Sequence, residues 1–374
     1  MRVLVCIPCL LTGGTEIQTL NLVRALVEGG YEVTTVCYFE FSLDMVTRYE
    51  HAGSKVIRLS TDGIRPVGVM STLIFLFKGL RQVIKGCQPD IAHVQYMAPG
   101  AIPIIFLRML GVKKIIATTH TFADIYPNLQ LIHFIVNHVL VAFQCITLRA
   151  EESYFGGSKF YSETYPLRKK GNHFTIYNAL PCGVKTCNNR RNHQPKVIGV
   201  VSRLEPIKGM DLVIPAFAEV KNTHPHVKLI IVGNGSLKKL MQQQAKEFGV
   251  LDSIEWAGRQ PQEKLHEWYG KMDIVLMPSR SEGFGLTAIE AMANGCVVVA
   301  SNTGGLPEVV KNGEVGLLHT SESIASLAEK IVFLMNDESI IKGMQHNLRK
   351  HLTQYSFTYF AQMMNNLYSR IWDL

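Results

Sequence analysis

The chain has 374 residues, which suits two domains of about 150–200 residues better than a single core. Hydrophobic residues make up 47% of the chain and charged residues 18%, a balance that excludes a disordered protein. The formal net charge is +8, but the basic residues are dispersed and show no interleaving with aromatic residues, so we expect no nucleic-acid partner.

The predicted location is cytoplasmic. The eight cysteines are scattered and mostly apolar in context, which favours a reduced chain over a disulfide framework or a zinc site. Met1–Ile7 already has the pattern of a strand, so we expect no secretory signal. No uninterrupted apolar run reaches the ~20 residues that a transmembrane helix needs.

The N-terminal half begins with a strand that runs to about Cys9 and a loop that contains Gly13-Gly14. A helix over 17–27 carries apolar residues on one face, and a second strand over 31–39 follows. This order is typical of doubly wound α/β sheets. The loop lacks a GxGxxG pattern, and its glycines by themselves would serve any tight turn equally well.

Further strands are predicted over 55–59, 91–94 and 114–118. Thr119-His120 directly follows the last of them, at the carboxyl end where open α/β sheets bind ligands. His120 is therefore a candidate to hydrogen-bond a sugar or accept a proton near neutral pH, although a structural role is equally open.

Two apolar helical segments, 70–85 and 101–110, bear on membrane contact. The dense apolar residues over 73–77 fit either a packed core helix or a membrane-facing one, whereas Pro103 and Arg108 argue against a membrane span in the second segment. With the positive net charge, this leaves open a peripheral contact with an anionic membrane, on the inner face of the cytoplasmic membrane.

A polar, aperiodic segment divides the chain, which predicts an N-terminal domain over 1–182, a linker over 183–195 and a second domain over 196–355. The first strand of the second domain ends at a proline-bearing loop with Arg203 and Lys208. Two cations there can clamp a diphosphate, with surface salt bridges as the alternative.

The stretch Pro278–Glu290 follows an apolar strand over 273–277 and passes through a glycine-containing loop into a helix that begins near Leu286. The free N–H groups of a helix N-terminus suit a phosphate. Glu282 and Glu290 then remain for sugar hydroxyls, so the pattern indicates a sugar-nucleotide site.

Four motifs together resemble those of the retaining nucleotide-sugar glycosyltransferases called family four or group one. Ser202–Gly209 is similar to the family's S/G-R-x-x-x-x-K-G loop, and Glu282…Glu290 to its E-x7-E signature. The turn 304–308 resembles the family's GG-x-P-E, and the loop 13–16 resembles its N-terminal Gly-Gly loop. The motifs occur in the family's order from one end of the chain to the other.

The resemblance implies the glycosyltransferase-B fold: two Rossmann-like doubly wound domains facing across a cleft, with a C-terminal helix, here 356–374, crossing back to the N-terminal domain. It implies that Glu290 binds the donor ribose and that Glu282 and His120 contact the donor sugar. It also implies that Arg203 and Lys208 neutralise the departing diphosphate in place of a metal. The remaining donor contacts that it implies are Gly13, Gly14, Gly283, Phe284, Gly285, Leu286 and Arg259.

The expected reaction moves a hexosyl group from a nucleotide diphosphate sugar to a hydroxyl group of a saccharide or lipid-linked acceptor. The resemblance implies retained anomeric configuration and no metal, and we favour a UDP-sugar over a GDP-sugar and a role in cell-surface polysaccharide or glycolipid synthesis. Two alternatives stay open: a sugar-nucleotide 2-epimerase of similar fold, and a non-catalytic nucleotide-sugar-binding protein. Asn178-Ala179-Leu180-Pro181 departs from the family's N-G-V-D motif, which weakens inference about the hinge and acceptor.

Overall fold

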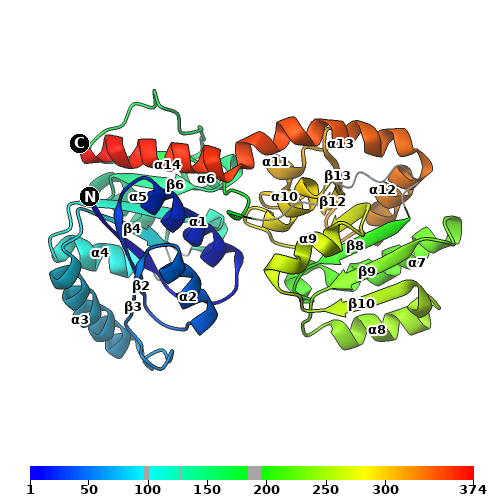
Figure 1. Ribbon diagram of the computed structural model, residues 1–374, viewed down its shortest axis with the longest axis horizontal. Helices are drawn as coiled ribbons and strands as arrows, with labels where there is room; N and C mark the ends of the chain where they lie inside the picture. Colours follow the sequence, from blue (N-terminus) through cyan, green and yellow to red (C-terminus); the bar gives the residue numbers. More distant parts are fainter. Residues whose placement is uncertain (97–100, 127, 184–195) are drawn as a thin grey trace. The chain divides into compact units, whose positions relative to one another are not determined.

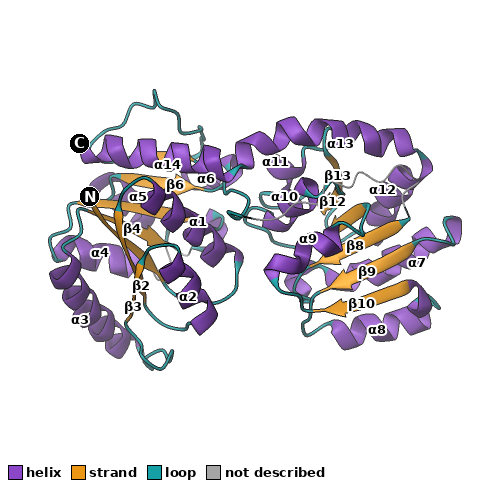
Figure 2. Ribbon diagram, viewed as in Figure 1, coloured by secondary structure: helices purple, strands orange, loops and turns teal. Residues whose placement is uncertain are grey.

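The structure is a computed structural model that describes residues 1–96, 101–126, 128–183 and 196–374. The chain forms two compact units, one made of Met1–Cys182 with Ser356–Leu374 and the other of Gly183–Tyr355. Each unit is a parallel sheet flanked by helices, which confirms the predicted pair of doubly wound α/β domains (Figures 1 and 2). The predicted linker lies, apart from Gly183, outside the described residues.

The N-terminal unit contains a seven-stranded parallel sheet in the order β3-β2-β1-β4-β5-β6-β7. Its strands are β1 (Arg2–Ile7), β2 (Glu32–Cys37), β3 (Lys55–Arg58), β4 (Ile91–Gln95), β5 (Lys114–Thr119), β6 (Ala142–Cys145) and β7 (Asn172–Thr175). The sequence did not predict β6 and β7, because both are four residues long and carry buried polar side chains. Asn172 of β7, for example, is buried and donates to the carbonyl of Val141 at 2.6 Å.

The helices of this unit cover both faces of its sheet. They are α1 (Gly14–Glu28), α2 (Leu43–His51), α3 (Val69–Cys87), α4 (Ala101–Met109), α5 (Leu129–His138), α6 (Leu148–Phe155) and α14 (Phe357–Trp372). Side chains along a strand alternate between the faces. In β1, Val3 and Val5 therefore join a core with α1, α2 and α14, while Leu4 and Cys6 join a second core with α3 to α6.

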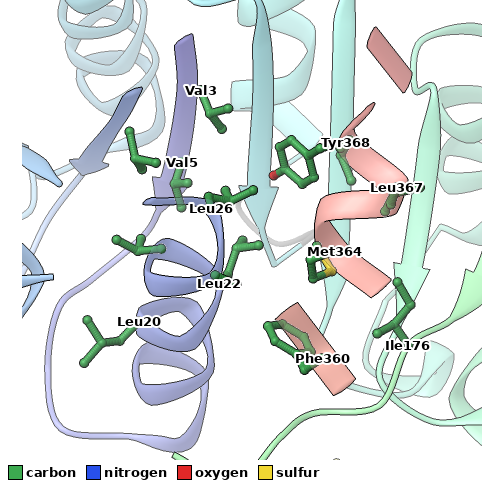
Figure 3. Close-up of a cluster of buried hydrophobic side chains, with 14 of the residues drawn as sticks. Val3, Val5, Leu20, Leu22, Leu26, Ile176, Phe360, Met364, Leu367 and Tyr368 are labelled. Carbon is green, nitrogen blue, oxygen red and sulfur yellow. The ribbon is translucent and has the colours of Figure 1, made fainter. Parts of the chain in front are cut away.

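The C-terminal helix α14 completes the first of these cores, as predicted. Three of its apolar side chains, Phe360, Met364 and Leu367, lie in one buried cluster with Leu22 and Leu26 of α1 (Figure 3). The helix begins where Ser356 Oγ accepts the backbone N–H of Tyr359 at 3.2 Å, an N-cap that satisfies a free helix donor.

The apolar segment 73–77 of α3 is mostly packed. Leu76 is buried, Phe75 stacks on Phe39 with ring centroids 6.3 Å apart, and Phe77 meets Phe106 of α4 edge-on at 5.3 Å. This favours the packed core helix for these residues. Within the described ranges, no helix is long and apolar enough to cross a membrane.

The cysteines of the described residues are all free thiols. Cys6 and Cys9 have the Cys-x-x-Cys spacing found in redox and metal sites. Burial raises the pKa of each thiol to about 12, so both stay protonated, whereas redox and metal chemistry needs the thiolate.

The second unit contains a six-stranded parallel sheet in the order β10-β9-β8-β11-β12-β13. Its strands are β8 (Val197–Val201), β9 (Lys228–Val232), β10 (Ile254–Gly258), β11 (Ile274–Met277), β12 (Val297–Ser301) and β13 (Gly316–His319). Its helices are α7 (Val213–Thr223), α8 (Lys238–Glu247), α9 (Leu265–Tyr269), α10 (Leu286–Ala293), α11 (Leu306–Val310), α12 (Ile324–Asn336) and α13 (Glu338–Leu352). The short strand β13 was not predicted.

Both sheets reverse their strand order next to their first strand. In the N-terminal unit β1 lies between β2 and β4, and in the second unit β8 lies between β9 and β11. The carboxyl ends of β1 and β4, and those of β8 and β11, are therefore topological switch points, where open α/β sheets bind ligands.

Candidate functional site

At the β8–β11 switch point, the loops that follow the two strands touch through their backbones. Gly209 has a φ of +64°, and a Cβ added there would lie 1.9 Å from the carbonyl oxygen of Pro278. A side chain at position 209 would push the two loops apart. This explains why the predicted cation loop ends in Lys-Gly.

Lys208 and Glu282 are brought together by this contact. Lys208 closes a 3-10 turn over Pro206–Lys208, and Glu282 lies in the loop after β11. Lys208 Nζ donates to Glu282 Oε2 at 2.7 Å, and both side chains are about one-fifth exposed (21% and 17%). From the sequence we expected Lys208 to bind the diphosphate and Glu282 to contact the donor sugar. The ion pair between the two side chains was not predicted.

Arg280 is a residue of this site that the sequence analysis missed. Its guanidinium forms a forked pair with Asp211, with Nη1–Oδ1 and Nη2–Oδ2 distances of 2.8 and 2.9 Å. Nη1 also donates to the carbonyl of Pro206 at 2.5 Å, and the Arg280 backbone N–H donates to the carbonyl of Ile207 at 2.9 Å. Arg280 thus holds the turn that carries Lys208.

A third loop, the Gly-Gly turn after β12, supports Glu282 from its backbone side. A Cβ added to Gly304 would lie 1.9 Å from the Glu282 carbonyl oxygen, and the Gly305 N–H donates to that oxygen at 3.0 Å. Three motifs far apart in sequence are therefore packed against one another, backbone to backbone.

Helix α10 begins at Leu286, as predicted, after Gly285 with a φ of +107°. No side chain caps its N-terminus. Among the described residues, six other helices have, in contrast, a side chain that accepts a first-turn N–H: α2, α5, α6, α12, α13 and α14. The start of α10 therefore lacks the side-chain acceptor that would compete with an anion for its N–H groups.

Glu290, one turn into α10, is a buried carboxyl. Tyr269 of α9, which the sequence analysis missed, donates from its hydroxyl to Glu290 Oε2 at 3.2 Å. Burial raises the pKa of Glu290 to about 7, and the hydrogen bonds from Tyr269 and Gln262 oppose that rise only in part. Its protonation therefore changes near neutral pH.

The other predicted donor residues of this unit occupy more varied positions. Arg203 and Arg259 follow β8 and β10, and both side chains are exposed. The Phe284 ring is buried against Tyr355, with centroids 5.8 Å apart, so the side chain itself packs inside the unit. Gly283 and Leu286 are partly exposed, consistent with backbone donors at the loop.

In the N-terminal unit, the β1–β4 switch point joins the Gly-Gly loop to Tyr96. Gly13 is the N-cap of α1 and provides no side-chain cap, and Gly14 is exposed. One residue on, the Thr15 hydroxyl lies 2.7 Å from the Tyr96 hydroxyl. Tyr96 has a φ of +69°, which is strained for a bulky residue and is commonly found at functional sites.

His120 follows β5 and packs against this same tyrosine. Its ring centroid is 5.2 Å from that of Tyr96, and its Nε2 lies 2.8 Å from Gln95 Oε1. Because an amide oxygen only accepts, Nε2 carries the proton. Burial lowers the pKa of His120 to about 3, so the imidazole is neutral at physiological pH and is no longer poised to titrate as the sequence analysis expected.

A second buried histidine, His93, lies in a directed chain of hydrogen bonds that the sequence did not reveal. Thr118 donates its hydroxyl hydrogen to Gln144 Oε1 at 3.2 Å and must therefore accept from His93 Nε2 at 2.6 Å. His93 Nδ1 is then the acceptor for the Tyr368 hydroxyl of α14, at 2.7 Å. Burial lowers the pKa of His93 to about 3, in agreement with this neutral tautomer.

Across the described parts of the chain, no three His, Cys, Asp or Glu side chains come together in a way that would hold a metal ion.

Two sequence profiles match the chain. The profile described as glycosyl transferases group 1 matches residues 187–357, and the one described as glycosyltransferase family 4 matches residues 12–149. The D-inositol 3-phosphate glycosyltransferase of Corynebacterium jeikeium is 34% identical over 184 residues, 47% of this chain and 44% of that protein. The one of Acidothermus cellulolyticus is 35% identical over 168 residues, 41% and 38% of the two chains. In these matches the chain covers less than half of the length of each relative.

Solved structures share the fold over the whole chain. Anabaena HepE in complex with UDP and glucose aligns with a TM-score of 0.78 at 19% identity, over 99% of this chain and 100% of that chain. Sucrose-phosphate synthase of Thermosynechococcus elongatus aligns with a TM-score of 0.79 at 19% identity over both complete chains. The two profile matches, which together span both units, thus show that the chain belongs to the group 1 glycosyltransferases of family four, and the solved structures show the glycosyltransferase-B fold.

Proposed function

We propose that this protein transfers a hexosyl group from a nucleotide diphosphate sugar to a hydroxyl group of a saccharide or lipid-linked acceptor, with retained configuration. One observation carries the proposal: Lys208 and Glu282 meet at the β8–β11 switch point. An ammonium group there matches a diphosphate, and a carboxylate beside it matches sugar hydroxyls. In this proposal Glu290, on the helix that follows the Glu282 loop, accepts hydrogen bonds from the ribose hydroxyls.

The negative charge that develops on the leaving diphosphate calls for fixed positive groups nearby. Lys208 has three N–H donors, so it can keep its bond to Glu282 while it donates to a phosphate oxygen. The exposed Arg203 and the uncapped start of α10 add to this field, which supports catalysis without a metal. Because HepE was solved with UDP and glucose, we favour a UDP-sugar donor.

The donor is tested by nucleotide release with UDP-, GDP- and ADP-sugars against a panel of saccharide and lipid-linked acceptors, in buffer with Mg²⁺ or with EDTA. We expect acceptor-dependent release of UDP that EDTA leaves unchanged, and a product whose anomeric configuration by NMR equals that of the donor. Equilibration of UDP-GlcNAc without any acceptor would instead identify an epimerase. Failure of every donor to release nucleotide would favour a binding protein.

We also propose that the N-terminal unit contacts an anionic membrane surface. Apolar side chains are exposed where α3 begins: Val67 (95%), Val69 (77%), Met70 (69%) and Ile74 (49%). Exposed basic residues continue from Ile74 along the same stripe of the helix, at Lys78, Arg81 and Lys85. An apolar start followed by a basic stripe fits a headgroup interface.

Cosedimentation with phosphatidylglycerol–phosphatidylcholine vesicles tests this contact. The wild type should bind at low salt, and Ile74→Ser or Lys78→Glu should weaken binding severalfold, since each Lys near such a surface is worth about 1 kcal/mol. Leu240→Ser and Lys239→Glu on α8 are matched exposed controls from the other unit and should bind normally. Absence of wild-type binding at low salt would contradict the membrane contact.

A further inference from the structure

The cations around the β8–β11 switch point are not equivalent. Lys208 is bound by a single carboxylate oxygen, and the Arg203 side chain is exposed. Arg280, in contrast, has its guanidinium occupied by both oxygens of Asp211 and by the Pro206 carbonyl, and Glu322 lies 3.8 Å from its Nε. Its charge and its fork of donors are thus already matched inside the protein.

The groups that Arg280 holds all belong to the turn that presents Lys208. Pro206 and Ile207 immediately precede that lysine, and Asp211 follows it by three residues. The hydrogen bond from Arg280 also holds the pKa of Asp211 below its usual value, so the pair stays ionised at neutral pH. Planar, two-point pairing of this kind fixes orientation as well as distance.

We propose that the Arg280–Asp211 pair is a positioning device, which sets Lys208 against the donor diphosphate without touching the donor. The proposal rests on the proposed function of Lys208. Removal of the fork should let the Pro206–Lys208 turn shift, because the close approach at Gly209, one backbone hydrogen bond from Arg280 to Ile207 and the Lys208–Glu282 pair would then be the contacts left to hold it. A displacement of about 1 Å at a charge-stabilising group can cost on the order of 100-fold in rate.

A double-mutant cycle on the full-length enzyme tests the proposal, with steady-state kinetics on the donor sugar and thermal unfolding of every variant. Arg280→Gln and Asp211→Asn should each lower kcat about 10- to 100-fold and change the donor KM little, because the lost contact strengthens only as the diphosphate leaves. In a Lys208→Ala background, Arg280→Gln should lower kcat less than about twofold further. Arg280→Lys keeps the charge without the two-point pairing, so its kcat should lie between those of the wild type and Arg280→Gln. It replaces Arg280→Gln in the test if that variant folds poorly.

Lys342→Gln is the matched control, because it removes the cation of an ion pair with Glu338 (2.8 Å) whose lysine is exposed, on α13 of the same unit. It should leave kcat unchanged. If the two losses of kcat multiply in the Lys208→Ala, Arg280→Gln double variant, Arg280 has an independent role and the proposal is overturned. A wild-type kcat in Arg280→Gln with only a lower unfolding temperature would also overturn it. A wild-type kcat in Lys208→Ala would remove the proposed function of Lys208 itself, and this proposal with it.

Discussion

The two switch points of this protein are built on the same topology and yet have opposite chemistry. At β8–β11, ionised side chains meet in pairs, Lys208 with Glu282 and Arg280 with Asp211. At β1–β4, Tyr96 meets the neutral Thr15 and His120. The Glu16 carboxyl beside Gly13 accepts from a neutral thiol, that of Cys9 at 3.3 Å. The same sheet topology therefore carries different loop side chains at its two switch points, and we expect the loop residues to decide which part of a ligand each one takes. The charged end suits a diphosphate, and the neutral one suits hydroxyl groups.

The largest effects should come from the cations of the charged switch point. We expect Lys208→Ala and Arg203→Ala each to lower kcat on the order of 100-fold, the usual loss when a group that stabilises a developing anion is removed. Stopped assays of nucleotide release measure this. If both variants turn over at nearly the wild-type rate, the charged switch point does not act on the diphosphate.

The buried Glu290 should give the charged switch point a pH dependence. Only the carboxylate form accepts two ribose hydroxyls, and a pKa of about 7 means that this form is lost as pH falls through 7. UDP affinity by calorimetry should therefore weaken about tenfold from pH 8 to pH 6. Glu290→Gln should bind UDP more weakly at pH 8. Comparing the pH dependence of UDP affinity in the wild type and in Glu290→Gln separates titration of the carboxyl from titration of UDP itself. If UDP affinity changes equally with pH in both proteins, the assignment of Glu290 is contradicted.

His120 should show no such dependence, because burial holds its pKa near 3 and it stays neutral from pH 5.5 to 8.5. His120→Asn should lower kcat roughly fivefold, as loss of one hydrogen bond does, by the same factor at every pH in this range. A ratio of wild-type to variant rates that bends near pH 6–7 would show that the imidazole titrates after all.

The smallest effect is expected from Tyr96→Phe, which removes only the hydroxyl contact with Thr15. The free energy of unfolding of the N-terminal unit should fall by about 1 kcal/mol, measured by denaturant titration followed in that unit. Thr15→Val should cost a similar amount, and the double variant little more, because both remove one bond. Additive losses would mean that the two hydroxyls do not depend on each other.

The sequence predicted much of the fold and the charged site because both depend on local pattern. Apolar strands of five or more residues, each followed by a glycine-bearing loop, identified β8 and β9, and the motif order identified Lys208, Glu282 and Glu290. Short strands such as β6 and β7 escaped because their polar side chains are satisfied only by contacts distant in the chain, as Asn172 shows.

The neutral switch point was harder to predict for the same reason. Tyr96 acquires its role from a positive φ and from partners 81 and 24 residues away, Thr15 and His120, and nothing in its neighbours along the chain signals this. Arg280 lay inside the recognised stretch, but its partner Asp211 is 69 residues earlier. The expected role of His120 as a titrating base was altered by burial, which residue order alone does not give.

The helix α14 also has a consequence for biosynthesis. It supplies Phe360, Met364 and Leu367 to a core whose other members are translated more than 170 residues earlier, and its Tyr368 ends the hydrogen-bond chain of His93. The unit that begins first on the ribosome must therefore wait, with one face of its sheet only partly covered by α1 and α2, until the other unit has been made. The later-translated domain is the one that can finish folding first.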